Sequence, residues 1–220
     1  RFANPADFTF IFVGNIDPKD KATQDLIATY LGGLKTTKKK EKFDKVYNET
    51  PKGVIKNYFK REMQTKKASN RILYSGAMPY NINSMVHMNA IGSILNIRYL
   101  ESIREKEGGS YGVGVGAYAV NEPVEEAAIV MQFDTDPEKQ ERLMSIIHQE
   151  IDEIVKNGPK PEDLQKVKEN MLKQYAQDLE QNTWWSGALE IYYKDGINRL
   201  KDYKAAVEAL TAESIQKTLK

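Results

Sequence analysis

The sequence predicts an α+β fold, a two-layer sandwich in which helices cover a mostly antiparallel sheet. Short apolar runs bounded by turn residues recur between Phe8 and Phe133, as expected of strands. Longer stretches carry apolar residues at helical spacing, and everything after Pro161 is helical in character. Strands followed by helices, rather than a steady alternation of the two, favour α+β with an antiparallel sheet.

The first predicted elements are a strand over residues 8–13 and a helix that begins at Asp17 and Pro18 and ends at Gly32. A Lys-rich segment at about residues 35–52 follows, and we expect it to be an exposed connector. A basic docking patch is the alternative, but interspersed acids dilute its charge. The prediction is a single domain over residues 1–220 whose one internal division is this connector.

The middle of the chain predicts two more strands and a buried helix. Residues 54–61 and 71–77 have strand composition and are expected to be antiparallel neighbours. Residues 82–106 are apolar on most of the circumference of a helix, so this helix should be largely buried. Gly108 and Gly109 are expected to end it.

A hairpin and further helices complete the predicted fold. Residues 111–120 and 127–133 read as two strands joined by a short turn around Pro123. Pro137 opens an amphipathic helix that ends near Gly158, and another begins at Pro161 with acids in its first turn.

Composition excludes several classes of protein. The 32 Lys and Arg residues nearly balance 31 Asp and Glu residues, and the formal net charge of +1 makes nucleic acid an unexpected partner. No apolar run approaches the length of a spanning helix, so membrane insertion is not expected. The absence of Cys excludes disulfides, thiolate metal sites and cysteine nucleophiles.

Residues 112–117 contain a G-x-G-x-x-A pattern that resembles a dinucleotide-binding loop. That fingerprint needs a strand before it and a helix after it, whereas here a helix precedes and a strand is expected to follow. A strand with glycine along one face fits better. Such a face leaves the backbone open to close approach, for example by a peptide.

Neither a zinc site nor a serine nucleophile is predicted within this chain. It has two histidines, His87 and His148, and a zinc ion needs three or four ligands. His148 and Asp152 could lie on one helix face, but no third ligand is close in sequence. The patterns H-E-x-x-H, H-x-x-E-H and G-x-S-x-G are all absent. The chain itself is therefore expected to bind no metal and no cofactor.

Two aromatic pairs near the C-terminus, Trp184 with Trp185 and Tyr192 with Tyr193, admit two interpretations. They could bind carbohydrate or peptide. Their helical spacing favours packing of a helix on the sheet.

Arg104 and Tyr111 are seven residues apart, on either side of the Gly108–Gly109 turn. A guanidinium and a phenol brought together there could donate hydrogen bonds to a peptide carbonyl or to a developing oxyanion. Alternatively, Arg104 caps the end of the helix and Tyr111 packs at the start of a strand. Chemistry alone favours the second interpretation.

Residues 102–113 resemble the L-R-E-x-x-G-x-x-Y-x-V signature of the pitrilysin/insulinase family of zinc peptidases, the inverzincins. The signature belongs to the domain that follows the metal-binding domain. Residues 10–17 and 30–34 are similar to the strand and helix that open that domain, and residues 134–154 and those from Pro161 onward fit its later helices. The resemblance therefore covers nearly the whole chain.

This resemblance implies a pitrilysin or mitochondrial processing peptidase fold, in which two homologous halves close like a clamshell around a peptide. It implies that Arg104 and Tyr111 contact substrate and stabilise the tetrahedral intermediate. The zinc ion belongs to another domain, so the implied partners are a peptide substrate and the metal-binding half. Some members of the family are noncatalytic binding or assembly subunits, and relatives of this type suggest a bacterial envelope location.

Overall fold

The computed structural model describes residues 4–37, 39, 46–48, 50–105 and 112–220, with side chains omitted at Arg104 and Glu105. The chain divides into two compact units. The first consists of Arg1–Val46 and Tyr175–Leu200, and the second of Tyr47–Gln174 and Lys201–Lys220. Much of the Lys-rich connector lies outside the described residues, so the single-domain organisation stays a prediction.

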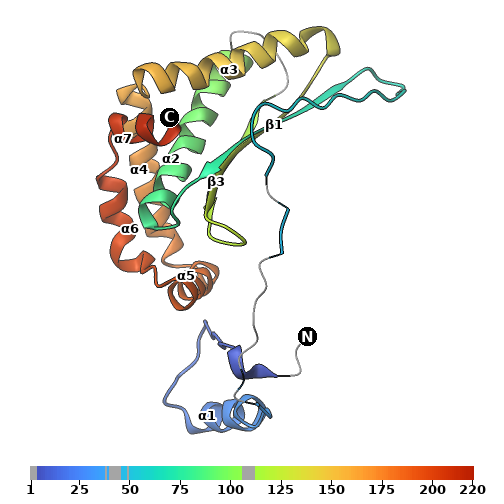
Figure 1. The fold of residues 1–220 in the computed structure, drawn as a ribbon. Coiled ribbons are helices and arrows are strands. Elements are labelled where there is room, and N and C mark those ends of the chain that lie inside the picture. The colour runs from blue at the N-terminus through green and yellow to red at the C-terminus, as the bar shows by residue number, and fades with distance from the viewer. Residues whose placement is uncertain (1–3, 38, 40–45, 49, 106–111) are drawn as a thin grey trace. The chain divides into compact units, whose positions relative to one another are not determined.

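Three antiparallel strands form the sheet of the second unit, in the order β1-β3-β2 (Figure 1). The strands are β1 (Ala68–Ala77), β2 (Gly114–Val120) and β3 (Glu126–Thr135). Ile72 of β1 and Val115 of β2 both stand opposite Met131 of β3, so these three side chains share one face. The predicted hairpin of the second and third strands is confirmed.

Two predicted strands are absent from the structure. Residues 8–13 and 54–61 are all described, and none belongs to a strand. The partner of β1 is β3, about fifty residues further along the chain, rather than residues 54–61. Alternating apolar residues favour an extended backbone, but a strand exists only where a neighbour supplies the hydrogen-bond ladder.

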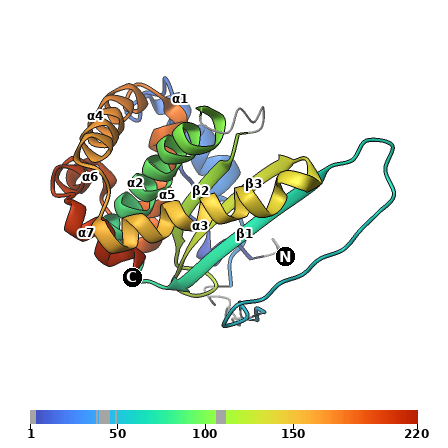
Figure 2. The same ribbon diagram turned by 90° about the horizontal axis from the view of Figure 1, so that it is seen from above.

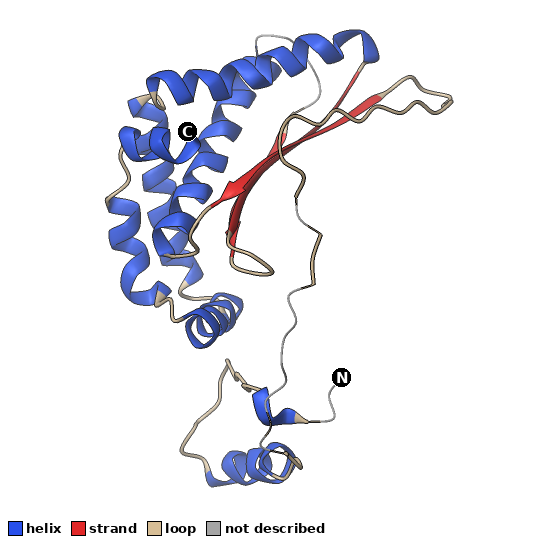
Figure 3. Ribbon diagram, in the orientation of Figure 1, coloured by secondary structure: helices blue, strands red, loops and turns tan. Residues whose placement is uncertain are grey.

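Helices account for most of the remaining chain (Figure 3). They are α2 (Ile82–Tyr99), α3 (Gln140–Asn157), α4 (Pro161–Asp178), α6 (Arg199–Glu208) and α7 (Ala212–Leu219). A π-helical turn, η3 (Leu100–Glu105), extends α2, and a 3₁₀ turn, η4 (Pro137–Lys139), precedes α3. The predicted long helix over residues 82–106 is therefore confirmed as far as Glu105, while Lys106 lies outside the described residues.

Helices α2 and α3 pack over one face of the sheet (Figure 2). The Asn81 side chain caps α2 by accepting a hydrogen bond from the Ser84 amide at 3.0 Å. At Gly92 the helix comes so close to β2 that an added Cβ would lie 3.1 Å from the Cβ of Ala117. The core between the layers includes Ile91, Ile94, Leu95, Met131, Phe133, Ile147 and Ile215. The predicted two-layer α+β class is confirmed.

The first unit holds the short helices η1 (Pro5–Asp7), α1 (Lys21–Ile27) and η2 (Ala28–Gly32), together with α5 (Asn182–Asp195). The cap of α1 is Asp20 and not Asp17: its carboxylate accepts from the Thr23 amide at 2.8 Å. Asp17 instead accepts from the Lys19 amide, within the turn that leads into the helix. No helix in the described part of the chain has the length and apolar character needed to cross a membrane.

Candidate functional site

By residue number, the two predicted site residues fall in the stretch between the end of α2 and the start of β2. The backbone of Arg104 belongs to η3, the π-helical turn that extends α2. Tyr111 lies outside the described residues, so the structure does not test whether the two side chains meet. A π-helical turn widens the backbone and is frequent at functional sites, which makes the position of Arg104 notable.

Core residues anchor the chain next to both site positions. Ile103 precedes Arg104 and is fully buried, at 0% exposure. Val113 follows Tyr111 by two residues and belongs to the same hydrophobic core. The described residues on both sides of this stretch are thus part of the packed core.

Asn96 holds the start of β2 against α2. Its side-chain oxygen accepts from the Val115 amide at 3.3 Å, and its side-chain nitrogen donates to the Val115 carbonyl at 3.3 Å and to the Gly92 carbonyl at 2.9 Å. Gly92, one turn earlier, meets Ala117, so α2 and β2 run in opposite directions. The end of α2 and the start of β2 therefore lie at the same end of the two-layer core.

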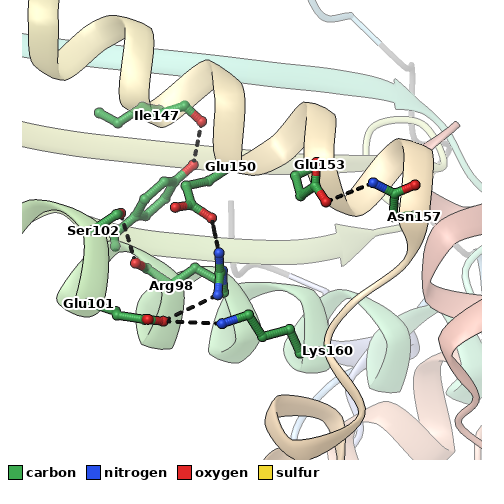
Figure 4. A network of polar contacts seen from close by, with 9 residues as sticks. Arg98, Glu101, Ser102, Ile147, Glu150, Glu153, Asn157 and Lys160 are labelled. Atoms are coloured by element: carbon green, nitrogen blue, oxygen red, sulfur yellow. Dashed lines mark hydrogen bonds and ion pairs between the residues drawn. The ribbon is translucent and has the colours of Figure 1, made fainter.

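Arg98 joins the last turn of α2 to α3. Its Nε and Nη2 atoms both lie 2.8 Å from Oε2 of Glu150, and Nη1 donates to Glu101 at 3.2 Å (Figure 4). Glu101 also lies 3.6 Å from the ammonium of Lys160, just before α4. The side chains of Arg98 and Glu150 are only 13% and 12% exposed, so this pair is shielded from water.

Tyr99 adds a neutral contact beside the Arg98 pair. Its hydroxyl donates to the carbonyl of Ile147 at 3.1 Å and lies 3.3 Å from the sulfur of Met131. Burial raises the pKa of this phenol far above its usual value, so it remains a donor at every physiological pH. Arg98 and Tyr99 together fix the helix end that leads into Arg104.

Asp163, in the first turn of α4, faces the same group of charges. It is 7% exposed, and its Oδ2 atom is buried without a hydrogen-bond partner in the described part of the chain. Burial raises the pKa of this carboxyl, while the positive charges of Arg98 and Lys160 oppose the rise.

The glycines of β2 lie on the sheet face opposite the helices. Gly116 pairs with Val130 of β3, which on its other side pairs with Leu73 of β1, and the half-exposed Leu73 marks this face as the one open to solvent. A Cβ added at Gly116 would meet no described atom within 4 Å. The open glycine face predicted from the sequence is therefore present. The strand continues through Val120 without a helix, which is incompatible with a dinucleotide-binding loop.

The histidines have local partners. His148 of α3 places Nδ1 2.6 Å from the hydroxyl of Tyr74, and His87 places Nδ1 2.7 Å from the carbonyl of Asn83. Burial, followed by the charge of Asp152, raises the pKa of Tyr74. Among the residues that the structure describes, no three His, Asp or Glu side chains gather in a way that suits a metal ion.

Sequence reasoning found the residues at the turn but missed those that support it. Arg98 and Glu101 have the spacing of a helical ion pair, which is a readable signal. The pairing of Arg98 with Glu150 and of Asn96 with β2 depends on tertiary contact, for which the sequence carries no local signal.

Comparison with known proteins places residues 1–171 in the family described as "Peptidase M16 inactive domain". Two curated relatives are similar over most of the chain. The Arabidopsis thaliana "Zinc protease PQQL-like" protein is 24% identical over 200 residues, which is 84% of this chain and 20% of that protein. The Escherichia coli "Probable zinc protease PqqL" is 22% identical over 182 residues, 83% of this chain and 19% of that protein.

The fold is also found in solved structures. A protease from Helicobacter pylori superimposes with a TM-score of 0.71 at 16% identity, covering 94% of this chain and 50% of that one. This likeness supports the fold alone. The chain spans 20% and 19% of the lengths of the two curated relatives, so it corresponds to one part of such proteins.

Proposed function

Because this chain belongs to the peptidase M16 inactive-domain family, we propose that it is the substrate-binding, clamshell-completing part of a zinc metalloendopeptidase that hydrolyses peptides. Arg104 and Tyr111 hold the peptide and stabilise the oxyanion that forms at the scissile carbonyl. The partner is the metal-binding half of the peptidase, in the same chain or in another subunit. By itself the chain does not cleave peptides.

The observation that carries this proposal is that buried core residues flank Arg104 and Tyr111 in the sequence. Donors that stabilise an oxyanion must be held in place before the reaction, since a loose donor loses much of its effect. Ile103 and Val113 are buried on either side of this stretch, and Asn96 ties its two flanking elements together. The resemblance to the L-R-E-x-x-G-x-x-Y-x-V signature supports the same pair of residues.

The zinc ion that relatives' names imply does not fit the side chains that the structure describes. A catalytic zinc site keeps three protein ligands and one open position. The ring Nδ1 atoms of His87 and His148 each contact a protein oxygen, and the described residues offer no third ligand near either ring. We therefore assign the metal to the other half, and the proposed role of this chain lies in binding and orientation.

The test is an Arg104→Ala, Tyr111→Phe double variant of the complete parent protein. Removing preformed oxyanion donors should lower kcat/KM for a fluorogenic peptide by about 100-fold or more. Arg61→Ala is the matched control, because Arg61 is exposed and outside the proposed site, and it should retain the parental rate. Full activity of the double variant would show that the proposed role is wrong.

A noncatalytic binding or assembly subunit of the same fold is the second candidate. The family description "inactive domain" favours this second candidate, because a domain without catalytic activity can also serve in binding or assembly alone. The two functions are distinguished by the parent sequence outside these residues: a metal-binding half with H-x-x-E-H supports the peptidase, and a half without it supports the assembly subunit.

A further inference from the structure

Trp184, in the first turn of α5, has a buried indole N–H for which the described residues offer no acceptor. The residue is only 8% exposed, and its Nε1 atom has no hydrogen-bond partner among the described residues. The adjacent Trp185 behaves as buried tryptophans usually do, because its Nε1 donates to the carbonyl of Leu179 at 2.9 Å. The two indoles of the chain thus differ in a way that calls for an explanation.

Arg199, the first residue of α6, presents a second unpartnered donor to the same ring. Its guanidinium carbon lies 5.4 Å from the centroid of Trp184, within the range of a cation–π contact. Its Nε atom is buried and has no acceptor among the described residues. In that part of the chain the guanidinium also has no ion pair with any carboxylate.

Aromatic contacts hold the two donors in place. The ring of Tyr175 meets Trp184 edge to face at 5.6 Å, and the ring of Trp185 does so at 5.1 Å. The Tyr175 hydroxyl donates to the carbonyl of Leu200, next to Arg199, at 3.1 Å. All of these residues belong to the first unit, so the arrangement does not depend on how the two units are placed.

In the described part of the chain, two buried donors lack acceptors, and one of them belongs to a partly buried cation without a carboxylate partner. A buried donor left unpaired costs stability, and so does a cation without a counter-charge. A water molecule could accept a hydrogen bond but would not neutralise the guanidinium. A carboxylate supplies two acceptor oxygens and the opposite charge, and it matches the planar donor arrangement of arginine.

We propose that Trp184 and Arg199 form a binding site for a peptide carboxylate, made of residues other than Arg104 and Tyr111. The carboxylate comes either from the C-terminus of a bound peptide or from an acidic side chain. The aromatic rings around the donors suit the apolar part of such a residue. Such a site would make the chain prefer peptides with an acidic side chain or a free C-terminus. The proposed function does not by itself include this preference.

The test uses the two indole N–H resonances of the ¹⁵N-labelled 220-residue chain, assigned with a Trp185→Phe variant. Three probes are titrated: N-acetyl-trialanine with a free carboxylate, the same peptide as its C-terminal amide, and N-acetyl-Ala-Glu-Ala-amide. The Trp184 resonance should shift with a carboxylate probe and stay in place with the neutral amide. The probe that produces the shift identifies the source of the carboxylate.

Arg199→Gln should raise the Kd of the active probe roughly tenfold or more, since the charge-assisted bond is lost. The Trp185 resonance reports folding within the same spectrum, and Arg199→Met, which also removes the charge and the N–H donors, replaces Arg199→Gln if that variant fails to fold. Arg104→Ala should leave the shift intact, so this result is independent of the proposed peptidase role. The proposal would be overturned if the Trp184 resonance did not shift with any probe, if it shifted equally with the neutral amide, or if the Arg199 variant had an unchanged Kd.

Discussion

At the scale of single residues, the charges around Arg98 differ sharply in how well they are matched. Glu150 and Glu101 each accept a hydrogen bond from the guanidinium, whereas one oxygen of Asp163 is buried with no partner among the described residues. A buried carboxylate without a donor prefers to be protonated, which agrees with the raised pKa of Asp163. Asp163 should therefore weaken the fold at neutral pH, while Arg98 should strengthen it.

We predict that Asp163→Asn raises the thermal stability at pH 7 by roughly 2–4 °C, as expected for about 1 kcal/mol in a chain of this size. The folded-state pKa of Asp163 lies above its ordinary value of 3.8, so the native state binds this proton more tightly than the unfolded state does. The destabilisation is fully present above the folded pKa and disappears as the pH falls toward 3.8.

Thermal unfolding followed by circular dichroism between pH 4 and pH 8 measures this difference. Glu162→Gln is the control, because Glu162 occupies the same helical turn but is exposed. If Asp163→Asn lowered the Tm at pH 7, or if its effect did not shrink toward pH 4, the inferred cost of the buried carboxylate would be wrong.

Arg98→Met should destabilise the chain by about 3–5 kcal/mol, because it leaves the shielded Glu150 carboxylate without its counter-charge. Adding Glu150→Leu should recover most of the loss, since a well-packed apolar pair can replace a buried ion pair. Denaturant unfolding measures both. Lys204→Met is the control: it breaks an ion pair that is 68% and 56% exposed, and should cost less than about 1 kcal/mol.

At the scale of elements, the contact of α2 with β2 fixes the relative positions of the two elements that flank the proposed site. The close approach at Gly92 lets Asn96 reach the backbone of Val115. A larger residue at position 92 would push the two layers apart, although alanine is intrinsically the better helix former. The packing between the layers is thus expected to outweigh helix propensity at this position.

Gly92→Ala should therefore destabilise the chain by about 1 kcal/mol, because the new Cβ would lie 3.1 Å from the Ala117 Cβ and 3.5 Å from its backbone nitrogen. Gly187→Ala, inside α5, is the matched control. A Cβ there would meet nothing within 4 Å, so only the gain in helix propensity remains, about 0.5–1 kcal/mol. Denaturant unfolding of both variants should give opposite signs, and equal signs would contradict the packing argument.

Elements with a strong local pattern could be predicted from the sequence. The apolar positions of α2 and α3 and the turn between β2 and β3 indicated these elements and their order. Residues 8–13 and 54–61 have equally strand-like composition but form no strand, because pairing depends on a distant neighbour. The same limit applies to the site: Arg104 and Tyr111 follow from a motif, whereas the Arg98–Glu150 contact spans 52 residues of sequence.

At the scale of the whole molecule, the chain resembles one part of a larger enzyme. Its relatives are named zinc proteases, and it covers 20% and 19% of their lengths. Among the described residues, no group of three His, Asp or Glu side chains could hold a metal ion. Under the proposed function, a division of labour between halves would let an "inactive domain" contribute hydrogen-bond donors without binding the metal itself.

We predict that the 220-residue chain, supplied with zinc, does not cleave a fluorogenic peptide, and that adding the separately produced metal-binding half of its parent restores cleavage. A zinc site assembled from this chain would need a third ligand near His87 or His148, which the described residues do not provide. The mixture with an Arg104→Ala, Tyr111→Phe chain should remain slow, which separates substrate positioning from mere association. Chelator-sensitive cleavage by the chain alone would contradict the assignment of the metal to the other half.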